Sequence, residues 1–183
     1  MPRYFAFLRA INVGGRNVKM EALRDAFVAM GFGGVETFIA SGNVIFSSRS
    51  SGPVLEGKIE TGLRETLGYE VKTFLRDDAE LAAIARYRPF SNADAMAAHG
   101  VYVGFLAEPL SLSGEEMLAR FQTDMDGFHA HGREVYWKRL QRQTDSKFSN
   151  AMFERTLRIS ATWRNVNTVQ RLAAKYGIAG VAV

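Results

Sequence analysis

One order of predicted elements occurs twice in this sequence, and it limits the fold more than any other feature. Between residues 4 and 76, apolar runs, helical periodicity and turn residues predict strand, helix, strand, strand, helix, strand. The same order returns between residues 101 and 163, without repeating the residues themselves. We therefore predict an α+β protein of two tandem ferredoxin-like βαββαβ units, with a linking helix and a C-terminal helix.

The predicted boundaries place the first unit at residues 1–77, and the linking helix, second unit and C-terminal helix at residues 78–183. Glycines and prolines set several ends, because Gly stops a helix and the residue before Pro avoids helical angles. The predicted strands are 4–11, 35–40, 44–47, 71–76, 101–106, 128–130, 134–138 and 160–163, and the clearest helices are 54–67, 79–87, 146–157 and 167–176.

Composition excludes several classes of protein. The 183 residues are 47% hydrophobic, which is enough for a core, and they include no Cys, so disulfide scaffolds, thiolate zinc sites and cysteine nucleophiles are excluded. The formal net charge of +4 is compatible with polyanion binding without requiring it. No apolar run is long enough for a signal peptide or a membrane span, so we expect a cytoplasmic protein with no membrane partner.

Three segments carry a resemblance to a known family. They are Leu-Arg-Ala-Ile-Asn-Val-Gly-Gly-Arg-Asn at 8–17, Ser-Gly-Asn-Val-Ile-Phe at 41–46, and Thr-Trp-Arg-Asn-Val-Asn-Thr-Val at 162–169. In sequence and spacing they resemble the bacterial family called domain of unknown function 1697. Ala10 and Val166 depart from it, since the family more often has Gly and an aromatic residue there. The resemblance implies tandem ferredoxin-like units and brings no activity with it.

The first candidate site is the turn that follows the first predicted strand. Two glycines, nearby cations and the start of a helix together are typical of places where backbone N–H groups hold a phosphate or carboxylate. An equally weighted alternative is that the glycines only turn the chain and Asn17 caps the helix. The candidate ligand-binding residues here are Arg9, Asn12, Gly14, Gly15, Arg16 and Asn17.

The second candidate site lies where the last predicted strand passes into the last helix. A cation near a helix N-terminus is unfavourable unless an anion or a carboxylate lies between them, so one interpretation, slightly less favoured than an ion pair, is a bound anion beside Arg164. The alternatives are an ion pair of Arg164 with Glu154, and Asn165 or Asn167 acting only as a helix cap. The candidate residues here are Lys147, Arg164, Asn165, Asn167 and Thr168.

Three functions stay open at this point. The first is binding of a small phosphate or carboxylate ligand between the two units. The second is binding of single-stranded nucleic acid on a sheet face that carries Phe5, Phe7 and Phe74. The third is a protein interaction scaffold. The three His residues lack metal-ligand spacing and no nucleophile motif occurs, so we expect no metal and no cofactor and leave catalysis undecided.

Overall fold

The computed structural model describes residues 1–11, 17–140 and 147–178, and the chain divides into two compact units. The first unit comprises Met1–Ala83 together with the chain from Tyr176 to the last described residue, Ile178. The second comprises the described residues between Ile84 and Lys175. Each contains one four-stranded sheet and its own core.

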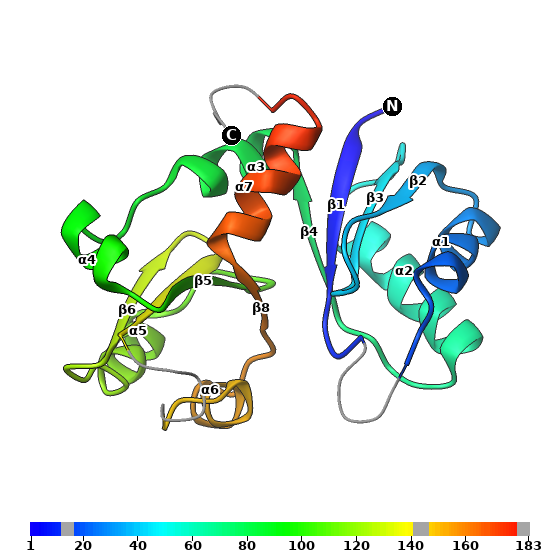
Figure 1. The fold of residues 1–183 in the computed structure, drawn as a ribbon. Helices are drawn as coiled ribbons and strands as arrows, with labels where there is room; N and C mark the ends of the chain where they lie inside the picture. Colours follow the sequence, from blue (N-terminus) through cyan, green and yellow to red (C-terminus); the bar gives the residue numbers. More distant parts are fainter. Residues whose placement is uncertain (12–16, 141–146, 179–183) are drawn as a thin grey trace. The chain divides into compact units, whose positions relative to one another are not determined.

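The sheet of the first unit has the strand order β2-β3-β1-β4, and neighbouring strands are antiparallel. Two helices, α1 and α2, lie on one of its faces, as Figure 1 shows. The elements of this unit are β1 (Arg3–Leu8), α1 (Met20–Ala29), β2 (Gly33–Thr37), β3 (Asn43–Ser47), α2 (Gly52–Leu67) and β4 (Thr73–Asp77).

Alternation along β1 divides its side chains between the two faces of this sheet. Ala6 and Leu8 point to the helix side and belong to the core with the α1 residues Leu23 and Phe27. Phe5 lies on the opposite face, because successive side chains of a strand point to opposite sides. The face of β1 that carries Ala6 and Leu8 is therefore the one that the helices cover.

The sheet of the second unit has the order β6-β7-β5-β8, again with antiparallel neighbours. Helices α5 and α6 lie on one face, and α7 lies on the other (Figure 1). The elements that follow β4 are α3 (Asp78–Arg86), α4 (Asn92–Ala97), β5 (Gly100–Phe105), α5 (Leu112–Ala119), β6 (Asp126–His131), β7 (Glu134–Arg139), α6 (Asn150–Leu157), β8 (Thr162–Asn165) and α7 (Val166–Lys175).

Most predicted elements exist, and the differences lie at their ends. The first strand ends at Leu8 rather than at residue 11, because Ala10 has a φ of 61° and leaves the extended conformation. Helix α6 begins at Asn150 rather than at residue 146, since Ser149 accepts a hydrogen bond from the Met152 backbone N–H at 3.2 Å. Helix α4 was not predicted; Ser91 caps it by accepting from the Asp94 backbone N–H.

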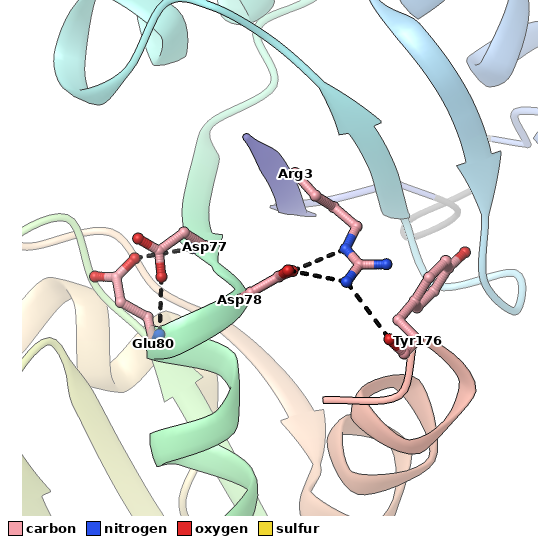
Figure 2. A network of polar contacts seen from close by, with 5 residues as sticks. All are labelled: Arg3, Asp77, Asp78, Glu80 and Tyr176. Carbon is pink, nitrogen blue, oxygen red and sulfur yellow. Dashed lines mark hydrogen bonds and ion pairs between the residues drawn. The ribbon is translucent and has the colours of Figure 1, made fainter. Parts of the chain in front are cut away.

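The linking helix α3 begins with a reciprocal cap. The Glu80 backbone N–H donates to Asp77 Oδ1 at 2.9 Å, and the Asp77 backbone N–H donates to Glu80 Oε2 at 3.0 Å (Figure 2). This capping box satisfies two backbone donors at the helix start. Within the described residues, no helix is long and apolar enough to cross a membrane.

Arg3 joins the two ends of the chain within the first unit. Its guanidinium makes two parallel hydrogen bonds to Asp78, at 2.8 and 2.9 Å, and Nη2 also donates to the Tyr176 carbonyl oxygen (Figure 2). The hydrogen bond to Asp78 raises the pKa of Arg3 above its ordinary value. Tyr176 itself packs against the Phe5 ring and donates from its hydroxyl to Glu36. The segment after α7 is therefore part of the first unit.

Candidate functional site

Four residues of the first candidate site, Asn12, Gly14, Gly15 and Arg16, lie outside the described residues. Arg9 follows β1, is half-buried, and donates its backbone N–H to the Lys72 carbonyl at 2.9 Å. Asn17 is exposed and precedes α1 by three residues. The alternative in which Asn17 caps α1 is wrong, because Lys19 occupies the N-cap position and makes no side-chain cap hydrogen bond.

Arg164 lies in the second unit and is buried, with 7% of its surface exposed. Its Nη1 donates to Thr162 Oγ1 and to the Trp163 carbonyl oxygen, both at 2.9 Å. Burial lowers the pKa of Arg164 to about 10, so the side chain still carries its charge at neutral pH. Glu154, the predicted ion-pair partner, accepts a hydrogen bond from the Ala161 backbone N–H at 2.9 Å. Both of these guanidinium bonds are to residues of its own strand, and Arg164 lines neither cavity described below.

Asn165 caps α7, as one of the sequence alternatives expected. Its Oδ1 accepts from the Asn167 backbone N–H at 2.9 Å, and the helix begins at Val166. This short-range bond satisfies one of the free donors at the helix start. Thr168 is half-buried in the first turn of α7, whereas Lys147 is exposed in the segment before α6.

A cavity of about 380 Å³ lies in the second unit where β8 passes into α7, and we call it the β8–α7 cavity. It receives side chains from the segment before α4, from the start of β5 and from the start of α7. Its lining residues are Tyr87, Arg88, Pro89, Phe90, Ala95, Ala98, His99, Gly100, Val101, Asn165, Val166, Asn167 and Gln170.

The polar lining of this cavity is cationic or neutral. Arg88 contributes a permanent positive charge, and among the described residues none that lines the cavity is Asp or Glu. Arg88 Nη1 donates to the carbonyl oxygens of Ala85 and Tyr87 at 2.8 and 3.0 Å, which holds the side chain in place. When the Gln170 amide is oriented with its oxygen toward Arg88, that oxygen accepts from Nη1 and Nη2 at 3.2 and 3.1 Å. The site is electrostatically suited to an anion.

Sequence reasoning found part of this cavity and missed the rest. It identified Asn165 and Asn167, but treated Arg88 only as the place where a helix ends and His99 only as one of three histidines without metal-ligand spacing. No local spacing joins residues 88 and 99 to residues 165–170, because the fold brings them together through β5 and α7.

The aromatic face considered for nucleic-acid binding is buried. Phe5, Phe7 and Phe74 expose 1%, 1% and 0% of their surfaces. Stacking of nucleobases requires open ring faces, so these three rings do not provide such a platform. The structure also contains no cluster of His, Asp or Glu that could hold a metal ion, within residues 1–11, 17–140 and 147–178.

Comparison with known proteins places the chain in a family. No curated protein matches it. The conserved bacterial protein SP0830 from Streptococcus pneumoniae has a similar fold, with a TM-score of 0.72 and 22% identity over 96% of this chain and 98% of that one. Residues 1–136 match the family described as protein of unknown function, DUF1697. The match covers the segments at 8–17 and 41–46 and confirms the family resemblance, so the chain belongs to the DUF1697 family.

Proposed function

We propose that this protein binds a small anion, a phosphate or a carboxylate, in the β8–α7 cavity of its second unit. The observation that carries the proposal is the composition of the lining: Arg88, His99 and the start of α7 face one cavity that no acidic side chain of the described residues lines. Of the residues proposed from sequence, Asn165 and Asn167 remain in the site.

Two electrostatic contributions favour an anion there. The ten-residue helix α7 places Val166 and Asn167, its first residues, in the lining, so the positive end of its dipole lies at the cavity. A negative group at such a position gains about 0.3–1 kcal/mol. A charge-assisted hydrogen bond from the Arg88 guanidinium adds about 1.5–3 kcal/mol.

The size of the cavity suggests what kind of anion it takes. Its volume of about 380 Å³ is in the range of small-molecule sites and exceeds what a single inorganic phosphate fills. Apolar lining from Phe90, Val101 and Val166 offers contact for a carbon skeleton or sugar. We therefore favour an organic phosphate or a polycarboxylate.

We further propose that each unit has the ferredoxin-like fold. Counting strands from the start of each unit, both sheets have the order 2-3-1-4 with antiparallel neighbours, which supports the proposal. The cytoplasmic location expected from the sequence stays a prediction.

Isothermal titration calorimetry with pyrophosphate and with citrate at low ionic strength tests the proposed function. The variant is Arg88→Gln, and the matched control is Arg120→Gln, which removes the same charge from an exposed position outside the lining. We expect the wild type and the control to bind alike and Arg88→Gln to bind roughly tenfold more weakly or worse. Equal affinity of all three proteins, or no binding to either anion, would contradict the proposal.

A further inference from the structure

We propose that the second unit contains a separate site for an aromatic carboxylate. A cavity of about 250 Å³, which we call the aromatic cavity, is walled by the rings of Tyr102, Trp137, Phe148 and Trp163. It shares only Asn165 with the β8–α7 cavity, so this inference goes beyond the proposed function and does not depend on it.

The walls are rings that hold one another in place. The centroids of Trp137 and Phe148 are 4.7 Å apart, and those of Phe148 and Trp163 are 5.6 Å apart at 83°. The Tyr102 ring lies 5.2 Å from Trp137. Contacts of this geometry are favourable beyond the effect of burial alone, and a flat ligand ring can extend them.

Two glycines of β5 make room for the ring walls. A Cβ on Gly104 would lie 2.9 Å from the Trp163 ring, and a Cβ on Gly100 would lie 2.8 Å from the Tyr102 ring. Both distances are shorter than carbon atoms tolerate without rearrangement. Any other residue at these two positions would displace a ring that lines the cavity.

Asn150 fixes the orientation of Trp163. The indole Nε1–H donates to Asn150 Oδ1 at 2.8 Å, and Asn150 Nδ2 donates to the Ala161 carbonyl at 3.3 Å. Because the indole donor is already engaged, Trp163 offers a ligand its ring surface rather than a hydrogen bond.

The cation beside these rings is Arg139, of which only 9% is exposed. Its guanidinium carbon lies 4.8 Å from the Tyr102 ring centroid and 5.6 Å from that of Trp137. Among the residues that the structure describes, Nε and Nη1 have no hydrogen-bond acceptor. A buried guanidinium with two unused donors is costly, and a negative group nearby would offset that cost.

Tyr102 links this cation to the cavity. Arg139 Nη2 donates to the Tyr102 hydroxyl oxygen, and within the described part of the chain the hydroxyl proton has no acceptor. Because the oxygen accepts from a cation, the hydroxyl is a strengthened donor toward a further acceptor. A carboxylate at Tyr102 with its aromatic ring among the four wall rings satisfies both features.

Intrinsic fluorescence provides a direct test, since the chain has two Trp residues and both line the aromatic cavity. We would titrate the protein with benzoate, with its neutral isostere benzamide and with the non-planar cyclohexanecarboxylate. Benzoate is expected to give a saturable change in tryptophan emission, and each comparator to bind roughly tenfold more weakly. No saturable change with benzoate, or equal binding of benzamide, would overturn the inference.

Tyr102→Phe keeps the ring and removes the hydroxyl. We expect it to weaken benzoate binding roughly tenfold, as loss of a hydrogen bond to a charged group does, whereas Tyr4→Phe, in β1 and in the lining of neither cavity, leaves binding unchanged. Unaltered benzoate affinity in Tyr102→Phe would contradict the inference. Arg88→Gln should also leave the benzoate titration unchanged, so failure here is distinguishable from failure of the proposed anion site.

Discussion

The side chain of Arg164 contacts the protein in the way that a core residue does. It is buried and donates to Thr162 Oγ1 and to the Trp163 carbonyl, although its position at a strand-to-helix junction is typical of an anion ligand. Arg88, which lies two residues beyond the end of α3, lines the β8–α7 cavity instead. Residue type and local position therefore do not separate an arginine that lines a cavity from one that is buried in the core.

Replacement of Arg164 should affect stability rather than surface electrostatics. Arg164→Ala removes the hydrogen bonds to Thr162 Oγ1 and to the Trp163 carbonyl and leaves a void, so we expect a loss of about 2–4 kcal/mol in the free energy of unfolding. Urea denaturation of Arg164→Ala beside Arg155→Ala, an exposed arginine on α6, measures the difference. A loss no larger than that of the exposed control would show that Arg164 is not a core residue.

Asp94 provides a prediction about pH. Hydrogen bonds from Lys138 and Ser91 lower the pKa of Asp94 below its ordinary 3.8. Because the folded pKa is lowered, the stabilisation is complete above the unfolded value and is lost as pH falls through the folded value. NMR titration of Lys138→Gln should show the Asp94 pKa moving up toward 3.8, since the 2.9 Å pair with Nζ is gone. An Asp94 titration identical to that of the wild type would contradict the assigned cause.

Local sequence could predict the Asn165 cap, but it could not predict the cavity beside it. A cap joins residues two positions apart, as Asn165 and Asn167 are, so spacing reveals it. The β8–α7 cavity joins residues 88, 99 and 165–170, and only the tertiary fold sets that proximity. The four residues Asn12, Gly14, Gly15 and Arg16 stay predictions.

At the scale of elements, the repeated strand and helix order was predictable because hydrophobic periodicity is a strong signal. The ends were less so. Ala10 takes a positive φ without being Gly, and the short helix α4 buries no residue, so neither leaves a hydrophobic pattern in the sequence. The need for glycine at Gly100 and Gly104 of β5 was not predicted either. It arises from the Tyr102 and Trp163 rings that lie over these two residues, and tertiary structure places those rings.

A glycine substitution in β5 tests whether the Trp163 ring requires glycine at position 104. Gly104→Ala places a Cβ 2.9 Å from the Trp163 ring, so we expect a loss of about 1–3 kcal/mol and a shifted tryptophan emission. Gly57→Ala in α2 is the matched control, because no atom lies within 4 Å of its added Cβ. The control should gain about 0.5–1 kcal/mol from helix propensity. Thermal denaturation of both variants decides the matter, and a neutral Gly104→Ala would refute the packing argument.

At the scale of the whole molecule, the segment that begins at Tyr176 belongs to the first unit although it follows the second unit in the sequence. Tyr176 follows α7 of the second unit, yet its contacts are with Arg3, Phe5 and Glu36 of the first. The sequence-based division at residue 77 could not predict that Tyr176 contacts the first unit. The residues that Tyr176 contacts are more than a hundred positions away in the sequence, so no local pattern links them. The first unit thus includes both ends of the described chain.

Removal of the Tyr176 side chain should therefore loosen the first unit. Tyr176→Ala loses ring contacts with Phe5 and Arg3 and the hydrogen bond to Glu36, and we expect a loss of about 1–3 kcal/mol. Amide hydrogen exchange should show a larger loss of protection in β1 than in β7. Greater loss in β7 would contradict the assignment of Tyr176 to the first unit.

The central claim is that the second unit binds an anion in the β8–α7 cavity, and amide chemical-shift mapping during a pyrophosphate titration tests it most directly. We predict that the largest shifts occur at Val166, Asn167 and Thr168 of α7 and at His99 and Gly100, and that Arg88→Gln abolishes them at the same concentration. Largest shifts among residues of the first unit, or no shifts at these amides, would contradict the claim.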